Sequence, residues 1–584
     1  MPGEPEARII EFGAFGISTA DRLLHRGGQV IPLFPKAIDT LLVLLTSDGR
    51  VLTKEELVKA VWGDIFIEGE GALARNISLL RKALGDRPGD SRYIQTIPRR
   101  GYRWVAPITE TPVTVVVFPL ENLARDPEQN YFSAGMTEAL LANLGKIAAL
   151  KVIAFPGVKP GESEPRPAEI AHSLGAGVAL NGCVLHDRGR VRITMHLLEA
   201  QTGLQLWADQ YDCNVQDVLE LQGNVSQQIA QAVRVKLTSR DQARLAAPRP
   251  VIPAAYGEYL KGRYHWNRRT PEGFWKAIEH FQRAVAADPA WAPPYAGLAD
   301  TYLLLGSTSY DVLPPREAMP KAKAAAASAL EMDDSNAEAH ASLGYSLLAY
   351  DWNLPVAERE FRRALELNPG YATAHHWYAH CLLAMGKMNE ARAEMGRALE
   401  RDPLSLVINT GLGWALYLAR RYDEAIEQYR KTLDMESDFV LARCMLGLAY
   451  KRKRMYAEAI AEFRRALAVS PESTFALAGL GRTFALRGNR KEALRILRKL
   501  TRLSKSRYVP SIHSASIYAA LGDNEHAYTC AAQACEERSH YLIYLNVDPS
   551  LGTFRDDPRF PGLARRIGLD KQATGSAADG FTAT

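Results

Sequence analysis

The chain has 584 residues, which is too long for one hydrophobic core and predicts three to four domains. Its 47% hydrophobic and 23% charged residues are typical of globular proteins, and a net charge of +5 over this length points to no single class of partner. The six cysteines are scattered without a CxxC pair, which argues against a disulfide framework or a zinc knuckle.

The sequence contains no recognisable targeting or membrane segment. No apolar run approaches the roughly 18 residues of a membrane span. The start MPGEPEARII lacks the basic and apolar regions of a signal peptide. Together with the scattered cysteines, these features predict a cytoplasmic protein that does not associate with a membrane.

The first hundred residues predict short strands and three helices. Strands are expected at 11–19 and 29–33, around a Gly27-Gly28 turn. A helix follows in FPKAIDTLLVLLTSDGR, with Pro35 in its first turn. Thr53 and Glu56 form a capping box that opens a second helix, TKEELVKAVWG, and GALARNISLLRKALG is the third.

The third helix is amphipathic and basic. Its apolar positions fall at steps of four, three and four, so they share one face: Leu73, Ile77, Leu80 and Leu84. The opposite face carries Arg75, Ser78, Leu79 and Lys82, flanked by Asn76 and Arg81. Residues 71–105 carry eight Lys and Arg against two acids, whereas residues 1–70 carry seven against eleven.

A hairpin follows at RYIQTIPRRGYRWV, with Arg99 and Arg100 at its tip. A basic helix face next to an arginine-tipped hairpin is typical of nucleic-acid binding. The alternative is a charged, solubilising turn, and Arg81 or Arg103 could simply pair with Asp86 or another local acid.

The order of strands, three helices and hairpin, with ISLLRKALGD leading to YIQTIPRRGYRW, resembles the winged helix-turn-helix domain of OmpR/PhoB-type regulators. The resemblance covers residues 8–107 and implies that the third helix enters the major groove while the hairpin, or wing, reaches the adjacent minor groove. We therefore expect the DNA-binding residues to be Arg75, Asn76, Ser78, Leu79, Arg81, Lys82, Arg99, Arg100 and Arg103. No phosphoacceptor receiver domain precedes this region, so we expect a one-component regulator controlled by the segments that follow.

The middle segment predicts an α/β domain over residues 111–240. Strands are expected at VTVVVF, LKVIAF, VALNGCVL, VRITMHLLEA and LQLWADQYD, interleaved with helices. VFPLENLARDPEQNYFSAGMTEAL and TGLQLWADQYD resemble the TolB amino-terminal-type domain of bacterial regulators. This module also accompanies class III nucleotide cyclases, which leaves a cyclase-linked signalling protein as an alternative, although no catalytic constellation is evident and no enzyme is expected.

Residues 251–570 predict an α-solenoid of about seven helix pairs, followed by a flexible tail at 571–584. Turn positions recur every 34 residues at Gly386, Arg420, Arg454, Gly488 and Gly522, and the pattern around Leu446-Gly447 and Pro471 resembles the tetratricopeptide repeat. The overall prediction is a multidomain α+β protein: a winged helix-turn-helix, a central α/β domain and an all-α solenoid.

The concave groove of such a solenoid is a candidate partner site. The resemblance places these residues in it: His376, His380, Thr410, Trp414, Cys444, Leu448, Phe475 and Arg482. Because they are mostly apolar and lack the Lys/Asn/Arg set that clamps a peptide carboxylate in some relatives, we expect a hydrophobic or helical protein segment. The alternative is that some of them pack on a neighbouring helix. His376 and His380 are four apart but have no third ligand, so no metal or cofactor is expected.

The sequence therefore predicts a regulator that binds double-stranded promoter DNA at its front and a protein or peptide behind it. RNA polymerase and a second copy of the chain are further candidate partners. The competing functions are a tetratricopeptide scaffold that binds DNA weakly and the cyclase-linked protein.

Overall fold

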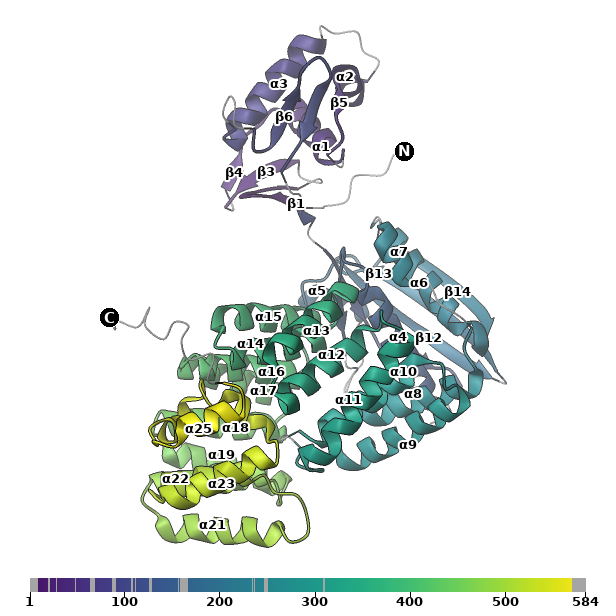
Figure 1. Ribbon diagram of the computed structural model, residues 1–584. Helices are drawn as coiled ribbons and strands as arrows, with labels where there is room; N and C mark the ends of the chain where they lie inside the picture. Colours follow the sequence, from purple (N-terminus) through teal and green to yellow (C-terminus); the bar gives the residue numbers. More distant parts are fainter. Residues whose placement is uncertain are drawn as a thin grey trace. The chain divides into compact units, whose positions relative to one another are not determined.

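The computed structural model divides the chain into two compact units, which we call the N-terminal unit (Met1–Val113) and the C-terminal unit (Thr114–Thr584) (Figure 1). It describes residues 9–569 apart from the segments 19–21, 28, 48, 64–68, 87–90, 107–108, 111, 125, 127–128, 156, 158–165, 188, 234, 236, 246–249 and 308–309. The predicted tail at 571–584 lies outside the described residues. The α/β segment and the repeats, expected as separate domains, form one compact unit.

The N-terminal unit has two sheets and three helices. One sheet has the order β4-β3-β2-β1-β8, from β1 (Ile9–Phe12), β2 (Phe15–Ser18), β3 (Leu23–Arg26), β4 (Gln29–Ile31) and β8 (Thr109–Glu110). The other has the order β5-β7-β6, from β5 (Leu52–Thr53), β6 (Ile94–Ile97) and β7 (Gly101–Trp104). The helices are α1 (Pro35–Leu45), α2 (Lys54–Trp62) and α3 (Gly69–Leu84).

The three predicted helices are confirmed, but the first sheet differs from the prediction. The stretch 11–19, expected as one strand, is part of a hairpin that turns at Gly13, where φ is +61°, and β3 was not predicted. A Cβ at Gly13 would lie 2.6 Å from the Tyr93 hydroxyl, so this tight turn also admits the ring of Tyr93. The rings of Phe12 and Trp104 meet at 4.9 Å and join the first sheet to the wing.

The capping box that opens α2 has the expected geometry. The Thr53 backbone N–H donates to the Glu56 carboxylate at 2.7 Å, and the Glu56 N–H donates to the Thr53 hydroxyl at 3.1 Å. These bonds satisfy two amide groups that a helix start leaves unpaired. The hydrogen bond to the Thr53 N–H, followed by the Arg50 side chain, lowers the pKa of Glu56.

The C-terminal unit begins with a mixed sheet in the order β11-β9-β12-β13-β14, with β10 beside β12. Its elements are β9 (Val113–Val117), β10 (Glu121–Asn122), α4 (Asn130–Gly145), β11 (Leu150–Ala154), α5 (Pro167–Ser173), β12 (Val178–Asp187), β13 (Arg190–Glu199), β14 (Gln205–Asn214), α6 (Val218–Ala232) and α7 (Ser239–Leu245). The predicted strands and helices of this segment are all present. The central strand β12 pairs in parallel with β9 and antiparallel with β13.

A solenoid of helix pairs follows. The paired helices are α8 (Pro253–Asn267) and α9 (Pro271–Ala287), α10 (Ala292–Leu305) and α11 (Pro315–Met332), α12 (Ala337–Ser346) and α13 (Leu354–Leu367), α14 (Ala372–Ala384) and α15 (Met388–Arg401), α16 (Leu406–Leu418) and α17 (Tyr422–Met435), α18 (Val440–Arg452) and α19 (Tyr456–Val469), α20 (Thr474–Leu486) and α21 (Arg490–Leu503), α22 (Ser511–Ala520) and α23 (Asn524–Glu536). The described residues thus form eight pairs rather than about seven. The first pairs are spaced by more than 34 residues, so counting repeats with a fixed period of 34 residues underestimates the number of pairs.

The 34-residue period has a backbone origin. All five predicted turn positions have a left-handed conformation, with φ between +61° and +85°, although two of them are Arg420 and Arg454. A residue in this conformation ends the first helix of each pair and lets the chain turn back. The small residues Ala391, Ala425, Ala459 and Ala493 are fully buried where the two helices meet.

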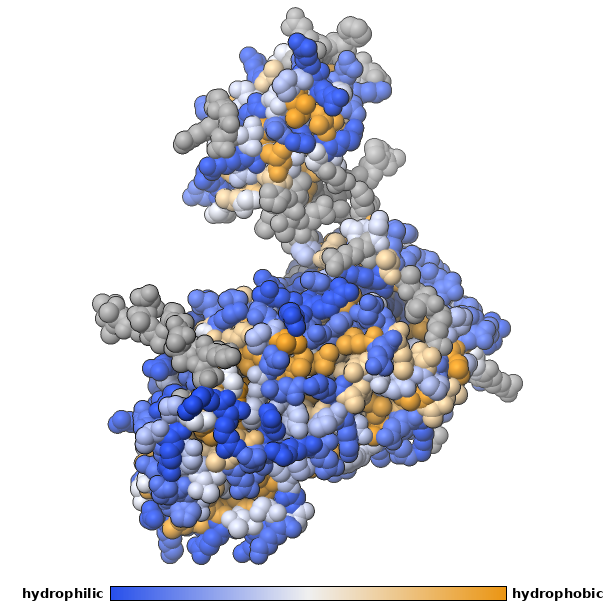
Figure 2. All heavy atoms as spheres, viewed as in Figure 1, coloured by the Kyte–Doolittle hydropathy of each residue, from blue (hydrophilic) through white to orange (hydrophobic). Residues whose placement is uncertain are grey.

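The solenoid ends in what we call the terminal segment, residues 540–569, which contains the short elements η4 (His540–Tyr544), η5 (Pro549–Leu551), α24 (Gly552–Arg555) and α25 (Phe560–Arg566). Its apolar side chains join the hydrophobic core of the repeats. Hydrophilic side chains cover much of the visible face of the C-terminal unit, with hydrophobic ones gathered in a band across it (Figure 2). Among the described residues, we find no helix with the length and hydrophobicity that a membrane crossing needs.

Candidate nucleic-acid interface and repeat groove

Helix α3 presents two different faces, as the sequence predicts. The four apolar residues Leu73, Ile77, Leu80 and Leu84 are buried against the rest of the N-terminal unit. On the outer face, Arg75, Ser78 and Lys82 are exposed and Leu79 is half-buried. The structure thus places two cations, a hydroxyl and an apolar side chain together on the outer face of one helix.

Asn76 does not belong to this outer face, and its prediction as a DNA-facing residue is wrong. Its side chain is only 7% exposed. The side-chain amide donates to the Lys36 carbonyl at 2.8 Å and to the Thr40 hydroxyl at 3.0 Å, both on α1. Asn76 therefore fixes α3 to α1 by satisfying buried acceptors, a role that helical spacing alone does not distinguish from a flanking surface position.

Arg81 joins α3 to the wing. Its guanidinium donates to the Ile94 carbonyl at 2.9 Å and to the Thr96 hydroxyl at 2.7 Å. Arg103, on the neighbouring strand, donates to the Gln95 side-chain oxygen at 3.2 Å. Both arginines are half-buried, and these hydrogen bonds go to neutral groups rather than to a local acid. Arg81 therefore holds the wing against α3, and Arg103 joins the two strands of the wing.

Asp86 was considered in the sequence only as a possible ion-pair partner, and the structure gives it another role. Its carboxylate accepts backbone N–H groups of Arg92, Tyr93 and Ile94 at 2.9, 3.1 and 2.9 Å. The signal in the sequence is its place directly after Gly85, whose φ of +76° ends α3. Asp86 therefore anchors the start of the wing to the end of the helix.

The wing tip is a tight turn that points two cations outward. The Arg100 N–H donates to the Ile97 carbonyl at 3.0 Å, with Pro98 second and Arg99 third in the turn. Arg99 has a backbone φ of +60°, which residues other than glycine rarely adopt. Arg99 and Arg100 are both exposed.

Gly101 allows β7 to pair with β5. Its φ is +146°, and a Cβ there would lie 1.9 Å from the Leu52 carbonyl oxygen. Such close backbone approach is a common reason for glycine in a strand. The glycine therefore holds the base of the wing against the body of the N-terminal unit.

The predicted partner groove is filled by the chain's own terminal segment. The His380 imidazole is hydrogen-bonded to the Tyr544 hydroxyl at 2.6 Å, and the Trp414 ring meets the rings of Tyr541 and Tyr544 at 6.3 and 5.5 Å. Arg482 donates to the Ser550 carbonyl. The expected apolar, aromatic character of the groove is thus present, but its occupant is intramolecular.

Most of the other predicted groove residues are also inaccessible. Thr410, Cys444 and Leu448 are buried, and Phe475 is half-buried. His376 is buried, with its Nε2 hydrogen-bonded to the Nε2 of His380 at 3.1 Å. Burial, together with the second imidazole, lowers the pKa of His376 well below its usual value, and burial lowers the pKa of His380 to about 4. Among the described residues, no cluster of three metal-ligating side chains occurs.

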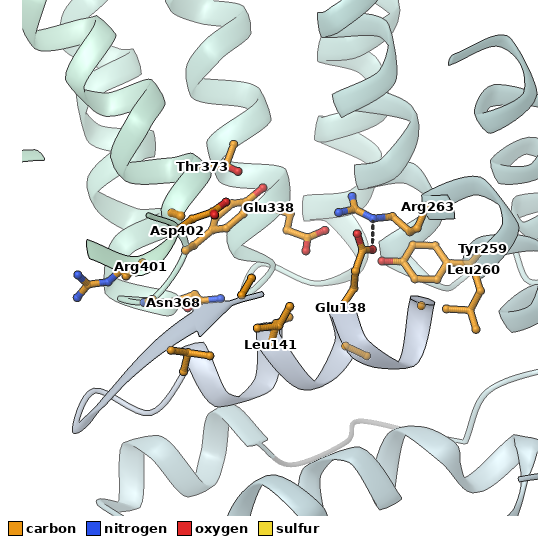
Figure 3. Close-up of a pocket in the computed structure, with 18 residues that line it drawn as sticks. Glu138, Leu141, Tyr259, Leu260, Arg263, Glu338, Asn368, Thr373, Arg401 and Asp402 are labelled. Carbon is orange, nitrogen blue, oxygen red and sulfur yellow. Dashed lines mark hydrogen bonds and ion pairs between the residues drawn. The ribbon is translucent and has the colours of Figure 1, made fainter. Parts of the chain in front are cut away.

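A cavity of about 210 Å³ lies where α4 and β11 meet the repeats (Figure 3). The Arg263 guanidinium lies 3.2 Å from the Glu138 carboxylate and 3.5 Å from that of Asp300. Arg401 donates to the Pro369 carbonyl at 2.9 Å. Burial raises the pKa of Asp402 to about 6. Arg263 and Arg401 thus both have acceptors within the chain. The cavity therefore gives no sign of a bound ligand.

Comparison with known families agrees with this architecture. Residues 28–104 match the family described as "Transcriptional regulatory protein, C terminal", and residues 353–407 and 444–507 match tetratricopeptide repeats. The fold and these matches define the class: a winged helix-turn-helix DNA-binding domain of OmpR/PhoB type joined to a tetratricopeptide solenoid. None of the matched modules is catalytic. The resemblance of residues 111–240 to a TolB amino-terminal-type domain stays a prediction.

Three curated relatives illustrate the similarity. The transcriptional regulator HilA of Salmonella typhimurium strain LT2 is 25% identical over 391 residues, 64% of this chain and 67% of HilA. The transcriptional activator CadC of Escherichia coli is 32% identical over 101 residues, 17% of this chain and 20% of CadC. A protein of Rhizobium meliloti named as adenylate cyclase 3 is 30% identical over 248 residues, 42% of each chain. The match therefore spans less than half of the cyclase-named relative.

Among solved structures, the DNA-binding domain of Escherichia coli CadC is similar to this chain at 30% identity. The match covers 18% of this chain and 98% of that domain, with a TM-score of 0.16.

Proposed function

We propose that this chain is a one-component transcription regulator that acts in the bacterial cytoplasm. The observation that carries the proposal is the joined surface of the N-terminal unit, where the cationic face of α3 and the arginine-tipped wing are held together by Arg81. A helix fits the major groove of DNA, and arginines suit the narrow, negative minor groove. The match of residues 28–104 to transcriptional regulatory proteins and the 25% identity to the regulator HilA over 391 residues support the proposal.

The residues divide into two groups. Arg75, Ser78, Leu79 and Lys82 face the base edges of the major groove, where Leu79 would meet a thymine methyl group. Arg99 and Arg100 contact the backbone or the minor groove, and Arg81 and Arg103 position the wing. Asn76 has no part in this surface because it is bonded to α1.

The C-terminal unit would supply control. A protein or peptide partner would compete with the terminal segment for the repeat groove, since Tyr541 and Tyr544 already occupy its aromatic part. RNA polymerase and a second copy of the chain are further candidate partners of the C-terminal unit.

The test is selection of genomic fragments by the full-length chain, followed by salt titration of one selected duplex. The four exposed cations of this surface, Arg75, Lys82, Arg99 and Arg100, predict a log–log salt slope of roughly −3 to −4. Changing Arg99 and Arg100 together to Ala should bring this slope to roughly −2 and weaken binding to all sequences alike. The matched control changes two exposed arginines of the solenoid, Arg464 and Arg487, to Ala and should leave the slope unchanged.

A scaffold that binds DNA without reading sequence is the competing function, and the apolar Leu79 on the outer face of α3 favours it. Equal retention of all genomic fragments would support the scaffold. A flat salt response would exclude both forms of DNA binding by this surface.

A further inference from the structure

A lysine without a partner lies inside the solenoid. Lys451, on α18, is only 4% exposed, and its Nζ has no hydrogen-bond partner among the described residues. Burial lowers the pKa of this lysine well below its usual value. An unpaired ammonium is costly in such a place, so buried lysines normally have an acceptor or a counter-ion.

Two more unsatisfied donors line the same small cavity. The cavity has a volume of about 40 Å³ and lies between α18, α20, α22 and the terminal segment. Arg482 and His513 line it together with Lys451, and the Arg482 Nε and the His513 Nε2 also lack hydrogen-bond partners among the described residues. A single water needs roughly 10–15 Å³ measured in this way, so the cavity has room for a small oxyanion.

The nearby acids do not pair with Lys451. The Asp548 carboxylate accepts from the Ser550 N–H at 2.7 Å, from the Ser550 hydroxyl at 2.8 Å and from the Tyr541 hydroxyl. One oxygen of Asp311 accepts from the Thr474 hydroxyl and lies 3.6 Å from His513, and the other has no hydrogen-bond partner among the described residues, but Asp311 does not line the cavity. Neither acid is hydrogen-bonded to Lys451, so the cavity combines cationic donors with too few acceptors.

We propose that this cavity binds one small oxyanion, either inorganic phosphate or the carboxylate of a small acid, between Lys451, Arg482 and His513. Phosphate and carboxylate oxygens accept hydrogen bonds from ammonium and guanidinium groups, and charge-assisted bonds of this kind are the strong ones. Tyr541 and Ser550 of the terminal segment close the cavity from one side. Anion binding therefore stabilises the seating of the terminal segment in the groove.

The test is thermal unfolding of the full-length chain with sodium phosphate or sodium acetate, compared with sodium chloride at equal ionic strength. Above the Kd, each tenfold rise in the free anion concentration should raise the unfolding temperature by about 1–2 °C. A response to phosphate, to acetate or to both supports the site and identifies the anion. Lys451→Met should abolish the response, whereas Lys491→Met, at an exposed lysine on α21, should keep it.

Hydrogen exchange of the unmodified chain gives a second measurement that does not depend on the folding of a variant. The bound anion should slow exchange of amides in residues 540–551 and leave the N-terminal unit unchanged. The proposal is overturned if neither anion exceeds chloride, if Lys451→Met protein responds as the unmodified chain does, or if exchange in 540–551 is unaffected. DNA binding by the N-terminal unit is measured separately, so its failure is distinguishable from failure of this site.

Discussion

Replacing Arg99 with Gly should separate backbone stability from DNA binding. Arg99 has a φ of +60°, and the left-handed conformation costs a non-glycine residue about 1–2 kcal/mol. Glycine lowers the free energy of unfolding by about 0.5–1 kcal/mol, because it has greater conformational freedom in the unfolded chain. We therefore expect Arg99→Gly to stabilise the N-terminal unit by about 0.5–1 kcal/mol.

The same change should weaken DNA binding. Losing one phosphate contact reduces the salt slope by about 0.9, which corresponds to roughly fivefold to tenfold in affinity at 0.1 M salt. Urea denaturation and fluorescence anisotropy of a labelled duplex measure the two effects on one preparation. Arg100→Ala should show the affinity loss without the gain in stability, because Arg100 has no left-handed backbone to relieve.

Arg420→Gly is the matched control. Arg420 is exposed, has a φ of +62° and lies at a solenoid turn, so the substitution removes one charge and one strained residue away from the DNA surface. It should stabilise the C-terminal unit and leave DNA affinity unchanged. An unaltered salt slope for Arg99→Gly would refute its contact with phosphate, and a loss of stability would refute the account of the wing turn.

Three further predictions follow from buried contacts. Gly101→Ala should destabilise the N-terminal unit by about 3 kcal/mol or more and abolish DNA binding, because its methyl group would collide with the Leu52 carbonyl; thermal unfolding and anisotropy check this. Asn76→Ala should cost about 1–2 kcal/mol in urea denaturation, because it removes two buried hydrogen bonds to α1, although the Lys36 carbonyl still accepts from the Thr40 hydroxyl, and it should not alter which sequences are selected. Burial lowers the pKa values of His380 and His540 to about 4 and about 3, so their stabilisation is complete above the unfolded pKa near 6.5 and is lost as pH falls below it. Between pH 7.5 and 5.0, each histidine should lower the free energy of unfolding of the C-terminal unit by about 2 kcal/mol, while the raised pKa values of Asp300 and Asp402 offset part of the loss. The loss should therefore be smaller in a His380→Gln variant than in the unmodified chain, and an equal loss would contradict the burial of His380.

The helices of the N-terminal unit were predictable because their signals are local. The capping box at Thr53 and the apolar spacing from Leu73 to Leu84 act within one helix, and both have the expected geometry. Asn76 shows where such reasoning fails. Its position on the helix leaves it between the two faces, and only the backbone of α1, about forty residues away in sequence, decides that its amide points inward.

The groove illustrates the same limit at longer range. The 34-residue period correctly identifies the turn residues, since each is fixed by its own helix end. No local pattern shows that Tyr544 would reach His380, because the two are separated by 164 residues and joined only by tertiary packing. The chemistry of the groove was therefore predictable, whereas its occupant was not.

The filled groove sets a condition on any search for binding partners. A bait with its terminal segment intact captures only those proteins that displace Tyr541 and Tyr544, so weak but specific ligands would be washed away. A second bait with both tyrosines changed to alanine lowers the affinity that a partner needs to enter the groove, and it leaves the sequence of the N-terminal unit unchanged. Proteins retained by the second bait and absent from the first are those whose binding the seated terminal segment blocks.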